Sequence, residues 1–278
     1  MTAGRAIGLL LGAAADGVIG TPKPFDRKNA ALAGGLFAGG VVVERVSRRS
    51  PVAQALGTAV ATWAVLRGAR LAEDGTALAR DLEEGELEDA RSTLAGLDSR
   101  CTEDLGVIGL SRAAVETVAE HTSGTVVGPM FWGAVAGMPG LIGSRVLAAY
   151  PSKLGELVNL VPTRLASALT VAGAPVVGGS ASGAWRAWRR DTVAHPSPNA
   201  GRIEAAFAGA LEIRLGGRTV YPTGVEERPV LGDGRNPDAG HVTRAVELSR
   251  VVGWLTAVSS AVLALLLTGF RRSRGSAA

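Results

Sequence analysis

The C-terminal part of the chain contains twenty consecutive residues, Val251–Phe270, without a charged side chain. Twenty residues of α-helix rise about 30 Å, which matches the hydrocarbon thickness of a bilayer. Arg271, Arg272 and Arg274 follow directly, and arginines clustered beside a membrane helix are typical of its cytoplasmic end. This stretch therefore predicts a transmembrane helix with the C-terminus in the cytoplasm.

Five other stretches are apolar and rich in small residues: Ile7–Ile19, Ala30–Val43, Val52–Leu66, Val126–Tyr150 and Leu160–Gly178. Small side chains allow close helix packing where no hydrophobic force drives helices together. The first three are shorter than the roughly 20 residues that a perpendicular helix needs, so they could be tilted, re-entrant or extended by snorkelling arginines. Arg45, Arg48 and Arg49 predict that the loop after the second stretch faces the cytoplasm.

Together these runs predict an all-α integral membrane protein with about five or six membrane segments, located in the cell membrane. We expect one domain over residues 1–278, with membrane segments at 7–66 and 126–179, a polar helical region at 67–125, a polar loop region at 180–250 and a last membrane helix at 251–270. Asp16 and the Gly20–Pro24 turn argue against a cleaved signal peptide.

Composition narrows the range of partners. The chain is 47% hydrophobic but only 4% aromatic, which favours small-residue membrane helices; a soluble Ala/Gly-rich protein is the alternative. Its net charge of +4 comes without a basic tract interleaved with aromatics, so we expect no nucleic acid as partner. Cys101 is the one cysteine, which excludes an intramolecular disulfide and a Cys-based metal site.

The stretch His195–Gly201 carries the sharpest polar signal in the chain. It places an imidazole, a hydroxyl and a carboxamide within seven residues that include two prolines. A helical pattern follows, and Asn199 or Gly201 could cap it, which would bring His195 and Ser197 beside a helix N-terminus that favours anions such as phosphate. The alternative is an ordinary proline-rich turn without chemistry.

A second candidate site lies at Glu116 and Glu120. These residues are four apart, so they share one face of a predicted helix beside the apolar run that starts at Val126. Two carboxylates at this spacing can hold Mg²⁺ or an ammonium group. A solvent-facing pair on an ordinary helix is the alternative.

Arginines between residues 180 and 250 suggest a membrane interface and an anion site. Arg190 ends a segment with Trp185 and Trp188, and indoles beside arginines are typical of the headgroup level. Arg228 and Arg235 lie in a region rich in glycine, where backbone amides and guanidinium groups suit phosphate. The chain has no Walker-type phosphate-binding motif.

Several of these segments resemble the CobD/CbiB family of integral-membrane adenosylcobinamide-phosphate synthases. The similar segments, in chain order, are Ala79–Leu82, Ala114–Glu120, Arg190–Asp191, His195–Gly201, Glu204–Leu211, Arg214–Gly217, Tyr221, Arg228–Pro229 and Leu231–Arg235. The resemblance spans most of the chain and implies the joining of a carboxyl group of adenosylcobyric acid to the amine of (R)-1-aminopropan-2-ol phosphate. ATP and Mg²⁺ are the implied cofactors, with an acyl phosphate as the expected intermediate.

The resemblance also implies roles for individual residues. Glu116 and Glu120 would bind Mg²⁺ or orient the amine, and His195 would act as general base or anion contact. Hydrogen bonds to phosphate or a corrin amide would come from Ser197 and Asn199, and phosphate charge would be neutralised by Arg190, Arg228 and Arg235. The implied partners are the corrinoid, aminopropanol phosphate, the lipid bilayer and other membrane proteins of cobalamin assembly.

Some family positions differ in this chain, which leaves a second interpretation open. The family motif Glu-Asn-Thr-x-Asp reads Glu120-His121-Thr122-Ser123-Gly124, and the Asn-Thr-Leu-Asp-Ser-Met segment falls at Ala148–Lys153 with only the serine kept. The lost side chains are of the kind that hold Mg²⁺ and phosphate. A non-catalytic membrane paralogue, acting as scaffold or cobamide-binding subunit, is therefore the main alternative to a synthase, and a small-solute transporter is a third.

Overall fold

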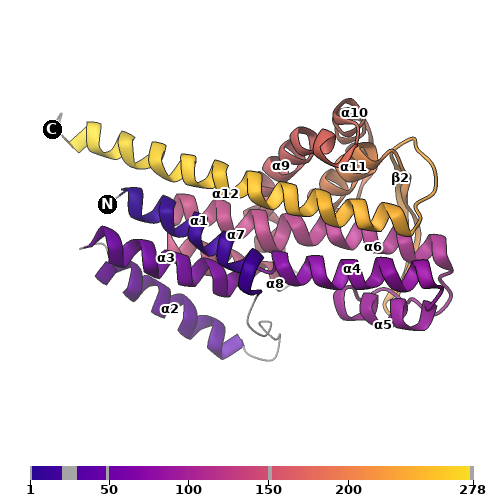
Figure 1. The fold of residues 1–278 in the computed structure, drawn as a ribbon, viewed down its shortest axis with the longest axis horizontal. Helices are drawn as coiled ribbons and strands as arrows, with labels where there is room; N and C mark the ends of the chain where they lie inside the picture. Colours follow the sequence, from indigo (N-terminus) through magenta and orange to yellow (C-terminus); the bar gives the residue numbers. More distant parts are fainter. Residues whose placement is uncertain (1, 21–29, 48–49, 150–151, 276–278) are drawn as a thin grey trace. The chain divides into compact units, whose positions relative to one another are not determined.

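The computed structural model describes residues 2–20, 30–47, 50–149 and 152–275. The chain is mostly helical, and its internal contacts divide it into two compact units (Figure 1). Unit 1 consists of Met1–Ala69, Gly124–Pro162 and Gly253–Ala278, and unit 2 of Arg70–Ser123 and Thr163–Val252. The residues predicted to form one domain therefore belong to two units, and the segments of the two units alternate along the sequence.

Unit 1 contains short apolar helices. They are α1 (Thr2–Ile19), α2 (Ala30–Ser47), α3 (Pro51–Val65), α7 (Gly128–Ala136) and α8 (Met138–Ala149). The first three match the predicted N-terminal stretches, and at 15 to 18 residues each rises only about 22–27 Å. Ser50 caps α3 by accepting a hydrogen bond from Ala53 N, and a proline occupies the first helical position.

Glycines join α1 closely to α3, which lies beside it (Figure 1). Gly4, Gly8 and Gly12 recur every four residues, so they form one stripe along α1. A Cβ atom built on Gly8 would lie 2.5 Å from Thr58 Cβ of α3, where real Cβ atoms do not fit. Unit 1 therefore uses the small-residue packing that the composition predicts.

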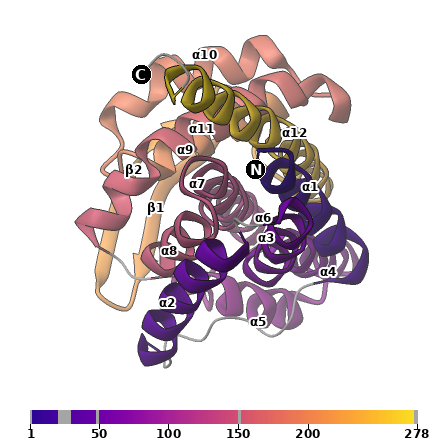
Figure 2. The same cartoon turned by 90° about the vertical axis from the view of Figure 1, so that its left-hand side faces the viewer.

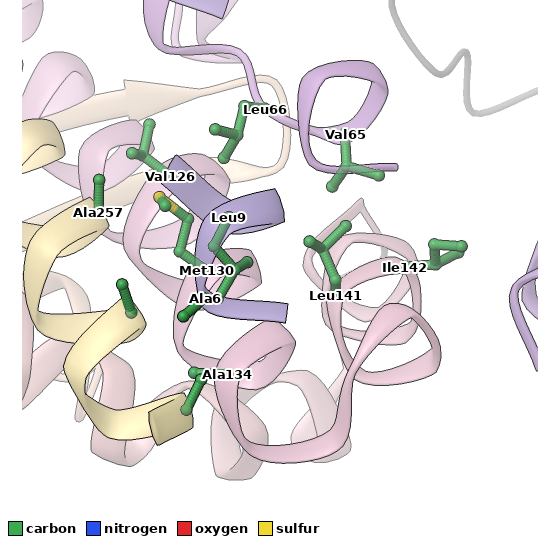
Figure 3. Packing of buried hydrophobic residues seen from close by; sticks show 12 residues of the cluster. Ala6, Leu9, Val65, Leu66, Val126, Met130, Ala134, Leu141, Ile142 and Ala257 are labelled. Atoms are coloured by element: carbon green, nitrogen blue, oxygen red, sulfur yellow. The ribbon is translucent and has the colours of Figure 1, made fainter. Parts of the chain in front are cut away.

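The apolar core of unit 1 lies between α1, α7, α8 and the C-terminal part of α12 (Ala239–Gly275), as Figure 3 shows. Leu9, Met130 and Leu141 are fully buried there. Beside this core, Arg5 Nη2 and Glu44 Oε1 form a buried ion pair of 2.6 Å. Glu44 also accepts a hydrogen bond from Met138 N at 3.3 Å, so the pair ties α2 to the start of α8.

Unit 2 holds the polar part of the chain. Its elements include most of α4 (Gly68–Glu84), α5 (Leu87–Leu97), α6 (Val107–His121), α10 (Ala181–Asp191) and α11 (Ala200–Leu211). Three of these helices, α4, α5 and α6, lie in the region 67–125 that was predicted to be polar and helical. The interpretation of 180–250 as a loop region is wrong, because small residues such as Gly183 and Gly209 pack α10 tightly on α11.

The all-α prediction fails at one β-hairpin in unit 2. Strands β1 (Leu215–Tyr221) and β2 (Gly224–Leu231) pair antiparallel, with Tyr221 opposite Gly224 (Figure 2). The register shifts between Leu215 and Gly217, and the residue at the shift, Gly216, has φ +81°. This left-handed conformation favours glycine, so the sequence Gly216-Gly217 permits the bulge.

Among the residues that the structure describes, two helices are long and apolar enough to cross a membrane, at Lys153–Val177 and Ala239–Leu267. The first comprises α9 (Lys153–Gly173) with the 3₁₀ turn after it, and the second is most of α12. Both match predicted membrane segments. Arg48, Arg49 and the predicted turn at Thr21–Pro24 lie outside the described residues.

Candidate active site

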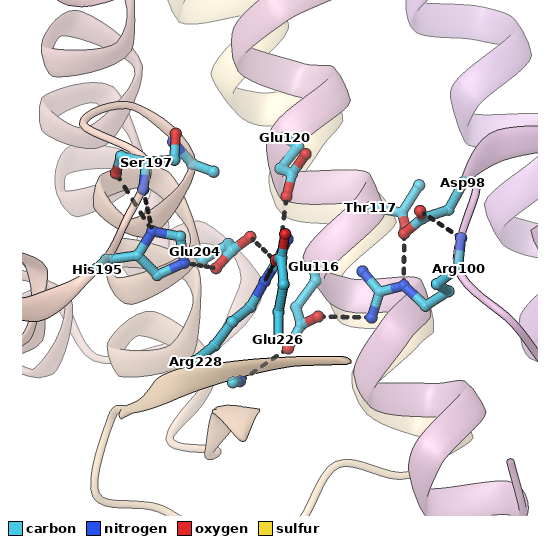
Figure 4. A network of polar contacts seen from close by, with 12 residues as sticks. Asp98, Arg100, Glu116, Thr117, Glu120, His195, Ser197, Glu204, Glu226 and Arg228 are labelled. Carbon is cyan, nitrogen blue, oxygen red and sulfur yellow. Dashed lines mark hydrogen bonds and ion pairs between the residues drawn. The ribbon is translucent and has the colours of Figure 1, made fainter. Parts of the chain in front are cut away.

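Glu116 is fully buried on α6 and is held by two partners. Its Oε2 atom pairs with Arg100 Nη1 at 2.7 Å, and its Oε1 atom accepts a hydrogen bond from Gly216 N at 2.8 Å (Figure 4). The β-bulge at Gly216 thus turns a backbone amide toward α6. Arg100 in turn contacts Asp98 Oδ2 at 2.5 Å, and Thr117 donates to the same carboxylate at 3.2 Å.

Glu120, one helical turn further along α6, meets a different set of groups. Arg228 Nη1 of β2 lies 3.9 Å from Glu120 Oε1 and 3.5 Å from Glu204 Oε1 of α11. Two carboxyl groups therefore converge on one guanidinium nitrogen (Figure 4). The other end of Arg228 is held by Tyr221, whose hydroxyl accepts from Nη2 at 2.7 Å.

His195 lies next to Glu204, with 3.5 Å between His195 Nε2 and Glu204 Oε2. The ring packs against the first turn of α11, where a Cβ atom on residue 201 would be 2.3 Å from His195 Cγ. Glycine at position 201 is therefore required for this approach. Ser197 N donates to His195 Nδ1 at 3.1 Å, which holds the ring within its own loop.

The start of α11 agrees with the prediction in part. Asn199 is the N-cap residue of the helix, but its side chain makes no cap hydrogen bond. Instead Ser197 Oγ accepts hydrogen bonds from Asn199 N at 3.3 Å and Ala200 N at 3.1 Å. Because this hydroxyl already satisfies two of the first amides, the helix end is a poorer anion site than the sequence suggested.

The electrostatics of the cluster favour a shared proton. Desolvation of its carboxyl group inside the cluster and the negative charge of Glu204 raise the pKa of Glu120 well above its usual value, although 38% of its side chain is exposed. Burial also raises the pKa of Glu204, to about 7, although a hydrogen bond with Glu120 opposes the rise. For His195, burial lowers the pKa, so the ring is neutral near pH 7. Two carboxyl groups close together hold one proton between them near neutral pH.

Arg190 and Arg235 have other partners. Arg190 of α10 forms a bidentate pair with Asp233, at 2.7 and 2.8 Å, and a second pair with Asp191. Arg235 Nε donates to His241 Nε2 at 3.2 Å. Of the predicted site residues, the structure thus brings together Glu116, Glu120, His195 and Arg228, with Ser197 and Asn199 in the adjoining loop.

Sequence reasoning missed Glu204, Arg100 and Tyr221 as members of the site. Glu204 had a local signal, because it is a single charge in the otherwise apolar run Ile203–Leu211 of α11. A charge in the buried face of a helix requires a partner. Arg100 and Tyr221 carried no such signal. Arg100 lies before α6 and Tyr221 ends β1, and the partners of both residues come from distant segments of the chain.

The carboxylates do not form a metal site in this arrangement. Both oxygens of Glu116 are engaged, one by Arg100 and one by Gly216 N. Within the described ranges, no group of three or more His, Cys, Asp or Glu side chains could hold a metal ion. The predicted Mg²⁺ ligation by Glu116 and Glu120 therefore does not fit the geometry.

Comparison with known proteins places the chain in a family. The model of the family described as "CobD/Cbib protein" matches residues 27–155 and 148–249. "Cobalamin biosynthesis protein CobD" of Mycobacterium tuberculosis (strain H37Rv) is 42% identical, over 96% of this chain and 97% of that protein. The protein of the same name from Geobacter metallireducens is 34% identical, over 85% of this chain and 81% of its own length. No solved structure matches. The chain belongs to the CobD/CbiB family.

Proposed function

We propose that this protein acts in cobalamin biosynthesis as an adenosylcobinamide-phosphate synthase. In this reaction ATP drives an amide bond between a carboxyl group of adenosylcobyric acid and the amine of (R)-1-aminopropan-2-ol phosphate. A relative that matches nearly the whole chain is named as a cobalamin biosynthesis protein. The observation that carries the proposal is the convergence of Glu120, Glu204 and His195 around Arg228.

Amide formation needs two kinds of help that such a cluster offers. A carboxylate must be activated, and an acyl phosphate is the intermediate we expect, with negative charge that cations stabilise. The amine reaches the enzyme as an ammonium ion, so it must bind near a negative group and lose a proton before it attacks. Glu120, with 38% of its side chain exposed, is the acid of this cluster that an incoming ammonium group can reach.

The contacts of the arginines that the resemblance implied as phosphate ligands suggest a role for each of them. Arg228 is held among Glu120, Glu204 and Tyr221, and we assign it to the amine side of the reaction. Arg190 is an exposed guanidinium whose aspartate partners would have to release it before it could bind phosphate. Since Glu116 does not fit as a metal ligand, we assign the Mg²⁺ expected with ATP to the nucleotide phosphates.

We also propose that the protein spans the cell membrane several times, with the C-terminus in the cytoplasm. Two helices are long enough to cross, and unit 1 presents many exposed apolar side chains. On α1 and α12 these include Leu11, Val18, Trp254, Val258 and Leu266. Water would disfavour such a surface, whereas lipid would cover it.

The alternative is a non-catalytic paralogue that binds a cobamide or acts as a scaffold. It is supported by the replaced family residues at His121 and Gly124, which flank or lie within the π-helix Thr122–Val127. The buried cluster of carboxyl groups argues against this alternative. Burying several carboxyl groups costs folding free energy, and a protein without a use for them could replace them with apolar side chains.

Complementation tests the proposal. A strain without its own synthase, supplied with cobyric acid as sole corrinoid, should grow with this chain and fail with Glu120→Ala or His195→Ala at equal membrane expression. Glu103→Ala, in the turn before α6, is the matched control and should support growth. No growth with the well-expressed wild-type chain would overturn the synthase and favour the paralogue.

A further inference from the structure

Glu204 is the least satisfied charge-bearing group of the cluster. It lies on the buried face of α11 with no exposed side-chain surface. Its Oε2 atom has no hydrogen-bond partner among the described residues, and neither does His195 Nε2, which faces it at 3.5 Å. A buried carboxylate oxygen left without a hydrogen bond is costly, so its retention points to a role in chemistry.

His195 is not positioned to accept a proton from a substrate. Its side chain is only 1% exposed. Nδ1 lies 3.1 Å from Ser197 N and 3.2 Å from Ser197 O, so the Ser197 backbone engages this ring nitrogen and Nε2 is the nitrogen that faces Glu204. The enclosed ring therefore contacts Glu204 rather than an incoming substrate, which makes His195 a positioning residue.

Glu120 connects this buried pair to the outside. Its side chain is 38% exposed, whereas Glu204 has no exposure and Arg228 has 10%. Glu120 and Glu204 approach the same guanidinium nitrogen of Arg228, at 3.9 and 3.5 Å, which brings the two carboxyl groups close together. A proton can thus pass between an accessible carboxyl group and a buried one.

We propose that Glu120 and Glu204 form a proton relay that deprotonates the ammonium group of the amine substrate, with Glu204 as the final acceptor and His195 as a positioning residue. Glu120 takes a proton from the ammonium nitrogen on one oxygen and releases the proton of its other oxygen to Glu204. The N–H bond breaks, the amine keeps the electron pair, and Glu204 loses its negative charge. This inference rests on the proposed function.

The charges around the pair suit this direction of transfer. The surroundings raise the pKa of Glu120 well above its usual value, while Glu204 has a pKa of about 7 and remains partly ionised at neutral pH. The groups that face the pair are Arg228 and Glu226 from β2, Tyr221 from β1, Glu116 from α6, His195 from its loop, and Arg100 with Asp98 before α6. Amide formation should therefore fall as pH drops below about 7, because Glu204 becomes protonated.

The test compares two nucleophiles on the full chain in lipid nanodiscs, with ATP, Mg²⁺ and the corrinoid acid. The first is aminopropanol phosphate, which must lose a proton. The second is hydroxylamine, which is largely uncharged at neutral pH and traps an acyl phosphate as a hydroxamate without a base. Glu204→Gln keeps the shape of the side chain and removes the acceptor.

We expect Glu204→Gln to lower amide formation by about 10²-fold or more and to leave hydroxamate formation nearly intact, since general-base effects are of this size. Its remaining amide rate should also lose the acidic limb of the pH profile. Glu227→Gln is the matched control, because Glu227 is an exposed acid of β2 that lies opposite Arg218 in the hairpin. It should change both products equally and only slightly.

Each other outcome has a definite meaning. Equal loss of amide and hydroxamate in Glu204→Gln would assign Glu204 a structural role and overturn the relay. Unchanged amide formation would overturn it as well. Hydroxamate from the wild-type chain would uphold the proposed activation by ATP whatever the variant does. If the wild-type chain forms neither product, the proposed function fails, and the relay with it.

Discussion

The two units of the molecule differ in the kinds of side chain that they bury and expose. Unit 1 packs helices through glycine and leaves large apolar side chains such as Leu11 and Val258 exposed. Unit 2 encloses a chain of charged groups that runs from Asp98 through Arg100 to Glu116, and a second set around Arg228. Its exposed helix faces are mostly polar, as in α4 and α10.

The difference indicates a division of work. Close packing of small residues suits helices in lipid, where van der Waals contact replaces the hydrophobic force. Buried ionic groups contribute little to stability unless every charge is paired, so their presence indicates a functional need. Under the proposed function, unit 1 would anchor the protein in the membrane and unit 2 would carry the chemistry. The following four experiments test this comparison.

The largest effect is expected at Arg100. Arg100→Met would leave Glu116 buried with an unpaired charge, which costs about 3–5 kcal/mol in unfolding free energy. Arg100→Met combined with Glu116→Met should recover most of this loss. Thermal unfolding followed by circular dichroism measures the loss. Arg218→Met, on the exposed side of β1, is the control and should stay within about 0.5 kcal/mol.

An arginine introduced on an exposed face of each unit tests whether that face contacts lipid or water. Val262 of α12 is 49% exposed and Val225 of β2 is 52% exposed. Val262→Arg should cost about 2.5–3.5 kcal/mol if that face meets the bilayer centre. Val225→Arg should cost no more than about 0.5 kcal/mol. Alkali-resistant membrane retention and thermal unfolding in nanodiscs measure both, and equal effects would contradict a lipid-facing α12.

The glycine stripe of α1 predicts a smaller loss in unit 1. Gly8→Ala would press a methyl group against Thr58 and should cost about 1–3 kcal/mol, as overpacking usually does. Gly39→Ala on α2 is the matched control, because no atom lies within 4 Å of the added carbon. It should gain up to about 1 kcal/mol from helix propensity. The check is the melting temperature in mild detergent, and a tolerated Gly8→Ala would argue against close α1–α3 packing.

The carboxyl pair predicts a gentle pH dependence in unit 2. Glu204 has a folded pKa of about 7 against 4.5 ordinarily, so the folded state keeps a proton that the unfolded chain releases. Stability should therefore fall as pH rises from about 4.5 to about 7, by at most about 1.4 kcal/mol per pH unit for one proton. Glu204→Gln should flatten the slope and exposed Glu212→Gln should not, as denaturant titrations at several pH values would show.

Much of the helical fold could be predicted from the apolar runs. Length and composition were enough for α3 and for the apolar parts of α1 and α12, because long apolar runs rich in small residues favour a helix. The hairpin was missed, since β1 contains glycines and alternates only weakly. Its pairing depends on contacts with β2 and on the bulge at Gly216, which propensity does not reveal.

The sequence alone determined that Glu116 and Glu120 share a helix face, and it marked His195 and Arg228 as candidates. Tertiary structure alone decided that Glu116 is held by Gly216, a hundred positions away, while Glu120 faces Glu204 and Arg228. Local spacing cannot encode these partners. The free energy of a buried charge depends on the groups that surround it, and those groups come together only when the chain folds.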